Sequence, residues 1–425
     1  MSHSIPHGAA FTSANPHALA TILEASQTKS IIASRDIFDI GGTKLWARDQ
    51  PVSSALQRKL LDRQLCNPLE SCLFAEDGVT EQTLTQATQA LIERDTPLAV
   101  VLRPHAAKLV AQVPRLPMHS VVQLLLTAGQ ASRPESFDHA VQAMALAGAL
   151  MIAHGGNLAD LRLAMLCGLM HDLGEMYIDP RYGEADADRT LDFTSYQQLV
   201  VHPHVGQLLV AQLTNYPGSV ARAIAEHHER CDGSGYPHGL QRDAISPLGR
   251  LLAVTESSLS ALRGSRPHMA RVSVALRVVP GEHDLSWAGL IADAARTQPA
   301  LTARLETQDV QARLARLDEG LRNAQACADG LGAHAQVPAL KDAVELARHL
   351  LGRLRKGWYA SGLWSFNAIS AQDAAEVEAI EDELIFRLRA IERATLLRAG
   401  DLPPEQGEQL RKLCEAFNAI EAPHA

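Results

Sequence analysis

The chain has 425 residues, of which 46% are hydrophobic and 4% aromatic, and its formal net charge at pH 7 is −9. This acidic balance disfavours a general binder of DNA or RNA duplexes, because binding the phosphate backbone demands a basic excess. The length and the apolar content suit a globular protein of about two or three domains with a sizeable core.

The cysteines and the apolar runs indicate where the protein works. The six cysteines are widely spaced and form no Cys-x-x-Cys pair, which disfavours a zinc ribbon, a redox motif or a secreted disulfide scaffold. The apolar run from Ala140 to Ala153 is interrupted by Gln142 and is too short to span a bilayer. We therefore expect a cytoplasmic protein without membrane insertion.

The N-terminal part is expected to hold a tail and a small regulatory module. Residues 1–36 are rich in Ser, His, Ala and Pro without sustained periodicity, which predicts a mobile tail. Residues 37–120 are predicted to form an α+β module. It begins with two short strands around the turn Gly41-Gly42, and an amphipathic helix follows from about Ser53 to Leu65.

Residues 121–280 are predicted to be helical. Apolar residues at helical spacing indicate helices over 139–153, over 159–172 and from 220 to 228. Each delivers His or acidic residues near one end, which is where a site between packed helices would be built. The predicted fold class is mainly α: a helical bundle with a small α+β module before it and a helical region after it.

Residues 281–425 form the predicted C-terminal helical region. Its clearest helix runs from Ala374 to Ala399, with apolar residues spaced by three or four and with Gly400 and Pro403 as stop signals. We favour packing of this helix within its own domain, and the alternative is the seam of a homodimer. No motif here is tied to chemistry, so a regulatory or dimerising role is the default.

Histidine is concentrated in the middle of the chain, where eight of the 18 fall within one hundred consecutive positions. The central pair is His171-Asp172, at the end of an apolar helix. An imidazole beside a carboxylate lets one metal take nitrogen from His171 while Asp172 bridges to a second metal. By itself, such a dipeptide more often caps a helix or forms an ion pair.

Other histidines favour the metal interpretation. His139, His202 and the pair His227-His228 also lie on or beside apolar helices, and buried neutral imidazoles are costly without partners. Glu135 lies one helical turn before His139 and would share its face of the helix. It is either a third metal position or a carboxylate that stabilises the helix N-terminus.

The double histidine runs into a glycine-rich turn, Glu229-Arg230-Cys231-Asp232-Gly233-Ser234-Gly235-Tyr236-Pro237. Its glycines permit positive φ and close backbone approach, Tyr236 offers a face on which a base can stack, and Pro237 fixes the exit. Directly after two histidines, this turn is a highly specific pattern.

These motifs resemble the HD-GYP domain, a bacterial subgroup of the HD phosphohydrolase superfamily. The resemblance spans about Glu135 to Pro267, roughly a third of the chain. It rests on His171-Asp172-x-Gly174, His202-Pro203-x-x-Gly206, the segment from His227-His228 to Tyr236-Pro237, and Arg266-Pro267.

The resemblance implies an all-helical domain that holds two or three divalent ions, iron or manganese, and hydrolyses cyclic di-GMP to pGpG and in some members on to GMP. His171 and Asp172 would carry catalysis, with Asp172 bridging two metals. The implied metal ligands are Glu135, His139, His171, Asp172, His202, His227, His228 and Glu256. The implied substrate contacts are Glu175, Gly235, Tyr236, Pro237, Arg242 and Arg266.

Three positions depart from the family pattern. Glu175 stands where the family usually has a lysine that reaches a substrate phosphate, so an attraction becomes a repulsion. Glu256 stands at an Asp ligand position, and Met269 stands where a basic residue is expected. Either an arginine replaces the lysine, or Glu175 itself binds metal or tunes a water. The candidate arginines are Arg181, Arg189, Arg242 and Arg266.

Two hypotheses of different classes follow. The first is a cyclic di-GMP phosphodiesterase of bacterial second-messenger signalling. The alternative is a catalytically weak or inactive module that binds metal and a cyclic dinucleotide, or a diguanylate cyclase partner, as a regulator. A phosphohydrolase for another cyclic dinucleotide is a third option, since these residues do not choose between guanine and adenine.

Overall fold

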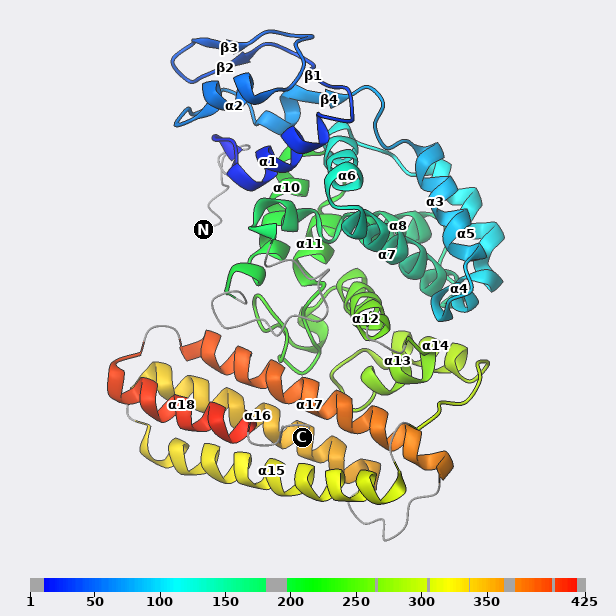
Figure 1. Cartoon of the computed structure of the whole chain (residues 1–425), viewed down its shortest axis with the longest axis vertical. Coiled ribbons are helices and arrows are strands. Elements are labelled where there is room, and N and C mark those ends of the chain that lie inside the picture. Colours follow the sequence, from blue (N-terminus) through cyan, green and yellow to red (C-terminus); the bar gives the residue numbers. More distant parts are fainter. Residues whose placement is uncertain are drawn as a thin grey trace. The chain divides into compact units, whose positions relative to one another are not determined.

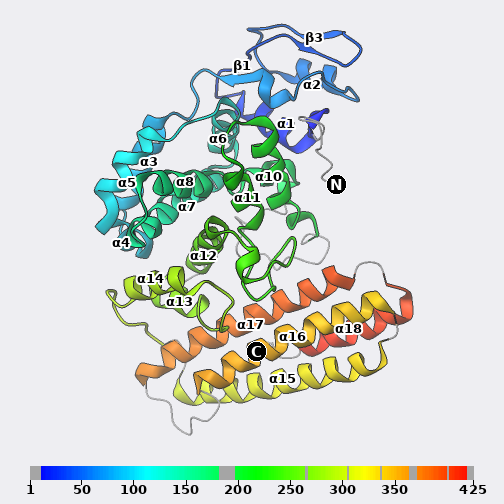
Figure 2. The same ribbon diagram turned by 180° about the vertical axis from the view of Figure 1, so that it is seen from behind.

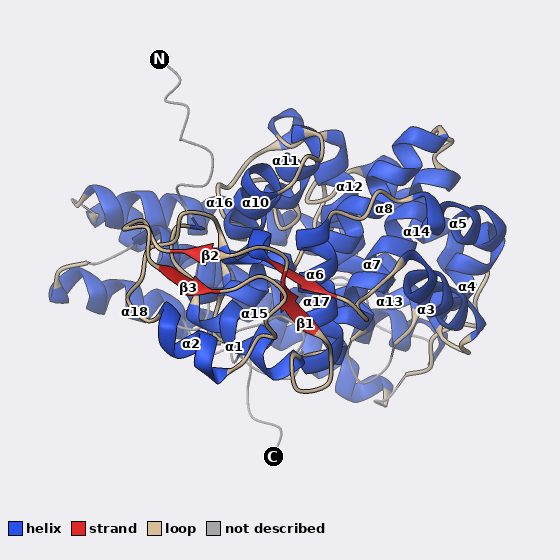
Figure 3. Ribbon diagram, turned by 90° about the horizontal axis from the view of Figure 1, so that it is seen from above, coloured by secondary structure: helices blue, strands red, loops and turns tan. Residues whose placement is uncertain are grey.

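A computed structural model of the chain describes residues 11–180, 197–263, 267–303, 306–335, 337–362, 371–399 and 402–418. Helices dominate these residues (Figure 1), and the described strands lie in the N-terminal part, where they are red in Figure 3. The mainly α fold expected from the sequence is confirmed.

The chain divides into two compact units. The first holds the described residues up to 180, together with Gln198–His228 and Ile245–Leu259. The second holds Glu229–Ala244 and the described residues from Ser260 onward. The second unit therefore includes the glycine-rich turn as well as the C-terminal helices.

Two small antiparallel sheets lie in the N-terminal part of the first unit. One pairs β1 (Ile31–Ala33) with β4 (Leu73–Ala75), and the other pairs β2 (Ile37–Phe38) with β3 (Lys44–Trp46). The second pair confirms the strands predicted around Gly41-Gly42. The helices of this part are α1 (Pro16–Ala25), α2 (Ser54–Leu60), α3 (Glu81–Glu93), α4 (Pro97–Leu102) and α5 (Ala106–Gln112), with the 3-10 helices η2 (Leu69–Cys72), η3 (Arg103–His105) and η4 (Val113–Arg115).

The expected mobile tail is wrong for the segment that forms α1 and β1. Asn15 caps α1, because its side chain accepts hydrogen bonds from the N–H groups of His17 and Ala18. Ile22 is fully buried on the inner face of α1. This apolar face, together with the cap, orders a segment whose composition alone suggests disorder. Residues 1–10 lie outside the described residues.

The remaining helices of the first unit carry the histidines. They are α6 (Ser120–Ser132), α7 (Pro134–Ala153), α8 (Leu158–Met170), the 3-10 helix η5 (Leu173–Tyr177), α10 (His202–Leu213), α11 (Gly218–Glu226) and α12 (Pro247–Leu262), which ends beyond Leu259. The backbones of α7 and α8 lie close together at Gly168, where a side chain would not fit. A Cβ added to this glycine would lie 2.5 Å from the carbonyl oxygen of Ala143. Among the described helices, α7 is long and apolar enough to cross a membrane, but 72% of that window is buried inside the protein.

Four long helices dominate the second unit and lie side by side in both Figure 1 and Figure 2. The helices of this unit are α13 (Met269–Ala275), α14 (Leu285–Ala295), α15 (Thr307–His334), α16 (Pro338–Ser361), α17 (Ala371–Ala399) and α18 (Pro404–Asn418), with the 3-10 helix η7 (Arg242–Ala244). Val377, Leu384 and Leu388 of α17 are buried in the core of this bundle. Packing of α17 within its own unit is therefore confirmed.

Candidate metal centre

His171 and Asp172 lie at the C-terminal end of α8. A capping box begins this helix, because the side chains of Asn157 and Asp160 each accept a hydrogen bond from the other's backbone N–H. The helix is apolar to its end, and His171 is only 1% exposed. The sequence thus places an imidazole and a carboxylate in a buried region, where polar groups need partners.

The first cluster of candidate ligands combines His139 of α7, His171, Asp172 and Glu256 of α12. Nε2 of His139 lies 3.1 Å from Nε2 of His171, 3.2 Å from Oδ2 of Asp172 and 2.9 Å from Oε2 of Glu256. Nε2 of His171 lies 3.1 Å from the same Asp172 oxygen and 3.3 Å from the same Glu256 oxygen. The extra methylene of Glu256, relative to Asp, does not keep its carboxylate out of this cluster.

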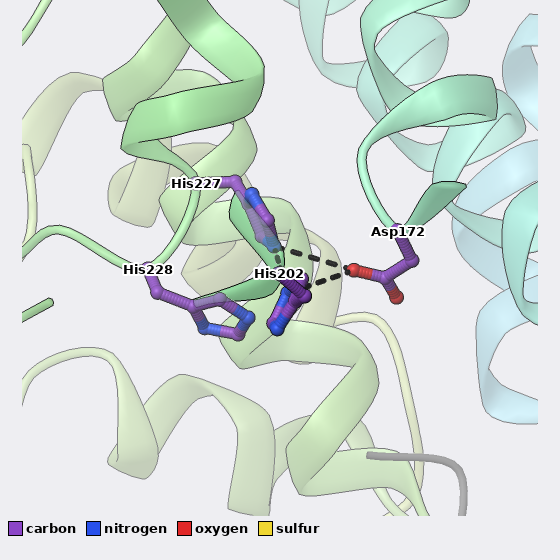
Figure 4. A group of neighbouring side chains, drawn as sticks. All are labelled: Asp172, His202, His227 and His228. Atoms are coloured by element: carbon purple, nitrogen blue, oxygen red, sulfur yellow. Dashed lines mark hydrogen bonds and ion pairs between the residues drawn. The ribbon is translucent and has the colours of Figure 1, made fainter. Parts of the chain in front are cut away.

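The second cluster combines Asp172 with His202, His227 and His228 (Figure 4). His202 opens α10, and the other two histidines directly follow α11. Nε2 of His202 lies 3.1 Å from Nε2 of His227, and these nitrogens lie 3.5 and 3.3 Å from Oδ1 of Asp172. Asp172 therefore faces the first cluster with Oδ2 and the second with Oδ1, as a bridging carboxylate must.

Backbone hydrogen bonds fix the tautomers of three of these histidines. Nδ1 of each ring lies within hydrogen-bonding distance of the carbonyl oxygen three residues earlier: 2.8 Å in His171, 2.7 Å in His202 and 2.6 Å in His227. A carbonyl oxygen only accepts hydrogen bonds, so Nδ1 of the neutral ring carries the hydrogen. Each Nε2 then offers a lone pair, which is the form of imidazole that binds metal.

The arrangement fits divalent cations. Two ligands that lie about 2.1 Å from one ion and about 90° apart are about 3.0 Å from each other, close to the separations within each cluster. Without a cation, converging lone pairs and carboxylates repel. Oδ1 of Asp172 is buried and has no hydrogen-bond partner among the described residues. The donor set and this orphaned oxygen both point to a centre for divalent metal, with Asp172 shared between two positions.

The pKa values of the residues in the centre reflect two opposing effects, burial and the charges of neighbouring side chains. Burial lowers the pKa of His227 to about 4, which keeps this ring neutral at physiological pH. Burial also acts to lower the pKa of His171, but the Asp172 and Glu256 carboxylates outweigh it and raise that pKa well above its usual value, so they favour a proton on Nε2 that a cation bound there would displace. The Asp172 carboxyl stays ionised, because the surrounding imidazoles outweigh burial and hold its pKa well below the usual range.

Gly174 explains part of the His-Asp-x-Gly motif. A Cβ at this position would lie 2.0 Å from the carbonyl oxygen of His202 and 2.8 Å from the amide nitrogen of Gly206. Only glycine therefore lets η5 approach the first turn of α10 so closely. The contact brings His202 next to Asp172.

The N-terminal segment packs against η5. The Tyr177 hydroxyl donates a 2.8 Å hydrogen bond to Glu70, and Asn15 donates one of 3.1 Å to the Tyr177 carbonyl oxygen. The Phe11 ring lies edge-on to the Tyr177 ring, with centroids 5.7 Å apart. Burial raises the pKa of Glu70. No sequence motif signals these contacts, which join residues far apart in the chain.

Glu175 lies in η5, is 7% exposed and belongs to neither cluster of candidate ligands. Burial lowers the pKa of the nearby Arg133 guanidinium, while the charge of Glu175 opposes that shift. Arg133 also donates hydrogen bonds to the Glu175 carbonyl oxygen at 3.4 Å and to the Thr21 hydroxyl at 2.9 Å. No sequence motif points to Arg133, the cation beside Glu175.

Other predicted residues lie apart from the two clusters. Glu135 is exposed in the first turn of α7, where a carboxylate interacts favourably with the helix dipole. Gly235, Tyr236, Pro237 and Arg242 all lie in the Glu229–Ala244 segment of the second unit, and the Tyr236-Pro237 peptide bond is cis. Arg181, Arg189 and Arg266 lie outside the described residues.

Comparisons with known proteins agree with this geometry. Residues 128–284 match the HD domain family. The chain is 32% identical over 168 residues to a cyclic di-GMP phosphodiesterase of Pseudomonas aeruginosa, covering 39% of each chain. It is 27% identical over 156 residues to a 3′3′-cGAMP-specific phosphodiesterase of Vibrio cholerae, covering 36% of this chain and 35% of that protein.

A cyclic di-GMP phosphodiesterase response regulator of Xanthomonas campestris is 33% identical over 110 residues, which cover 26% of this chain and 28% of that protein. The chain thus spans less than two fifths of the length of these relatives. No solved structure matches it significantly. The central segment is an HD domain, and its likeness to these phosphodiesterases supports the HD-GYP type expected from its motifs.

Proposed function

We propose that the chain is a metal-dependent phosphodiesterase that hydrolyses cyclic di-GMP to pGpG, with GMP as the product of a second hydrolysis. The observation that carries the proposal is the single Asp172 carboxylate, whose two oxygens face two separate clusters of buried imidazoles. The names of the relatives, all phosphodiesterases for cyclic dinucleotides, support the substrate class.

The proposed roles follow from the chemistry of the residues. A pair of divalent ions, iron or manganese, would polarise a phosphoryl oxygen and acidify a water. Asp172 would bridge them, and the carbonyl-bound rings of His171, His202 and His227 would hold their lone pairs toward them. Glu135 would matter only for a third ion.

Substrate binding is proposed for the glycine-rich turn and its neighbours. Tyr236 would stack on a base, and Gly235 and Pro237 would shape the backbone around the nucleotide. Arg242 or Arg266 would supply the positive charge that Glu175 does not. We also propose that residues 37–120 form a regulatory module for an HD-GYP domain over 121–280.

A direct assay tests the proposal. The full chain is purified without oxygen, loaded with Fe(II) or Mn(II), and incubated with cyclic di-GMP and, separately, with 3′3′-cGAMP. We expect pGpG from the first, and none from an Asp172→Asn variant of equal folded content. Full metal content without product from either nucleotide would contradict the enzyme and favour the regulator.

Cellular location and partners are part of the proposal. Six cysteines without disulfides suit a reducing cytoplasm. Burial of most of the apolar window of α7 supports a protein that does not insert into the membrane. A diguanylate cyclase partner and a homodimer stay predictions, which pull-down with a purified cyclase and light scattering would test.

A further inference from the structure

We infer that the C-terminal helical bundle holds the glycine-rich segment Glu229–Ala244, called the GYP loop below, in its substrate-binding conformation, and that Arg353 and Arg387 are positioning residues for it. The inference rests on the proposed function for the role of the loop in binding substrate. It assigns a role to the region of the chain that has no motif of its own. The residues involved all belong to the second unit.

The GYP loop is first organised from within. The Glu229 carboxylate is fully buried and accepts two 2.8 Å hydrogen bonds, one from the N–H of His238 and one from the N–H of Leu240. The Asp232 carboxylate accepts hydrogen bonds from the N–H and the hydroxyl of Ser234 at 3.0 and 2.6 Å. These bonds close the loop but leave its position relative to the helices open.

Helix α16 provides the first external contact. The Asp232 side chain is only 2% exposed, and its Oδ2 lies 3.3 Å from Nε of Arg353. Nε2 of His349, one turn earlier on α16, lies 3.4 Å from the backbone oxygen of Asp232. Arg353 also donates a hydrogen bond to the carbonyl oxygen of Pro280. One face of α16 thus contacts both the side chain and the backbone at the centre of the loop.

Helix α17 provides the second contact, through Glu282. The backbone oxygen of Glu282 accepts a 2.8 Å hydrogen bond from the N–H of Cys231. Its carboxylate, 4% exposed, lies 2.9 Å from Nε of Arg387 and 3.9 Å from Nε of Arg230. Arg387 also pairs with Glu383 at 2.7 Å. Arg387 therefore fixes Glu282, whose backbone oxygen accepts the hydrogen bond from Cys231 near the start of the loop.

These charges serve position more than bundle stability. The bundle has its own apolar core of residues such as Leu351, Leu384 and Phe417. A buried ion pair adds little net stability over apolar packing, whereas removal of one partner leaves an unpaired buried charge. The buried carboxylates of Asp232 and Glu282 are costly unless each stays paired with its arginine, Arg353 or Arg387. The geometry of the loop therefore depends on the helices that carry these arginines.

The first test compares Arg353→Met with Arg348→Met. Arg348 lies on the same helix and pairs at 2.7 Å with Asp329, and both side chains are about half exposed. We expect Arg353→Met to raise KM for cyclic di-GMP about tenfold, with metal content unchanged and kcat within about threefold, because a charge-assisted contact of the loop is lost. Arg353→Lys should restore part of the affinity, and Arg348→Met should match the wild type.

The second test compares Arg387→Lys with Arg313→Lys. Arg313 pairs with Glu381 at 2.8 Å and is similarly buried, but it joins α15 to α17 without contacting the loop. Both variants should lower the unfolding temperature, and only Arg387→Lys should raise KM. An equal KM in these two variants, or a changed metal content in Arg353→Met, would overturn the inference.

Hydrogen exchange separates this inference from the proposed function. The amide of Cys231 should exchange about tenfold faster in Arg353→Met and in Arg387→Lys than in the two control variants, since its hydrogen bond depends on the bundle. This readout needs no activity. Absence of phosphodiesterase activity with faster exchange would reject the proposed function alone, while unchanged exchange would reject the positioning role alone.

Discussion

The Nε2 atoms of His202 and His227 lie 3.1 Å apart, each in a ring whose Nδ1 lies next to a backbone carbonyl oxygen. With the hydrogen of each neutral ring on Nδ1, two lone pairs point at each other and at Oδ1 of Asp172. A hydrogen-bonded histidine network would alternate donors and acceptors. This pair presents acceptors only, so a cation is the partner that it fits.

Metal stoichiometry should therefore depend on which residue is removed. Asp172→Ala should lose both ions, and His171→Ala should lose at least the ion of its own cluster together with activity. Glu256→Ala and His228→Ala should each lose one ion, because each belongs to a single cluster. Elemental analysis of purified protein provides the measurement.

His204→Ala is the matched control for these substitutions, since His204 is exposed on α10 and belongs to neither cluster. It should keep the wild-type metal content. Loss of both ions in Glu256→Ala as well as in Asp172→Ala would contradict two positions joined by one carboxylate. Full metal content in both His171→Ala and Asp172→Ala would reject the metal assignment.

Gly174→Ala should unfold or strongly destabilise the first unit. The new methyl group would lie 2.0 Å from the His202 carbonyl oxygen, so the backbone must move, at a cost of about 3 kcal/mol or more. The control is Gly129→Ala in α6, where a Cβ meets nothing within 4 Å. There, removal of a helical glycine should stabilise by about 0.5–1 kcal/mol. Urea denaturation of both variants tests the contrast.

Glu175→Lys should destabilise the protein rather than restore a family lysine. The new ammonium would be nearly buried beside Arg133, which should cost about 2–4 kcal/mol. Glu175→Gln keeps the shape without the charge and should retain the metal content. Thermal unfolding distinguishes the two, and a Glu175→Lys variant as stable as the wild type would show that the lysine finds another place.

Stability should fall as the pH drops below about 6.5, and His283 should contribute to the fall. Burial, reinforced by Arg230 and Arg387, holds the pKa of this buried histidine well below its usual value. Below about pH 6.5 the unfolded chain takes up a proton that the folded chain rejects, so this group contributes a loss of up to about 1.4 kcal/mol per pH unit. Urea titrations at pH 7.5, 6.5 and 5.5 should show a smaller loss in His283→Phe.

The sequence brings the candidate ligands into view because they sit in fixed local positions. His171-Asp172 and His227-His228 end helices whose apolar periodicity and glycine stops are readable, and both pairs lie in the predicted centre. Glu135 shows the limit of such patterns. Its spacing from His139 predicts that both side chains share one face of α7. The helix begins at Pro134, however, so Glu135 lies in its first turn and is exposed.

Contacts between distant residues were beyond prediction. Arg387 and Glu282 are 105 positions apart, and His349 and Asp232 are 117 apart, with no pattern in either segment that marks the other. Similarly, nothing in Asn15 or Glu70 indicates that both bond to Tyr177. Such pairs form only when whole helices pack together, and the pattern of residues in one sequence does not predict which helices do so.

The passage of the chain from one unit to the other and back, at His228-Glu229 and again at Ala244-Ile245, limits how the protein can be divided. A protein shortened to residues 1–280 would keep every ligand of both clusters, and would lose Glu282, Arg353 and Arg387. Such a fragment would keep the candidate metal centre and lose these contacts to the loop. Under the proposed roles, a division of the chain near residue 280 would therefore separate the candidate ligands from the arginines that contact the loop and Glu282.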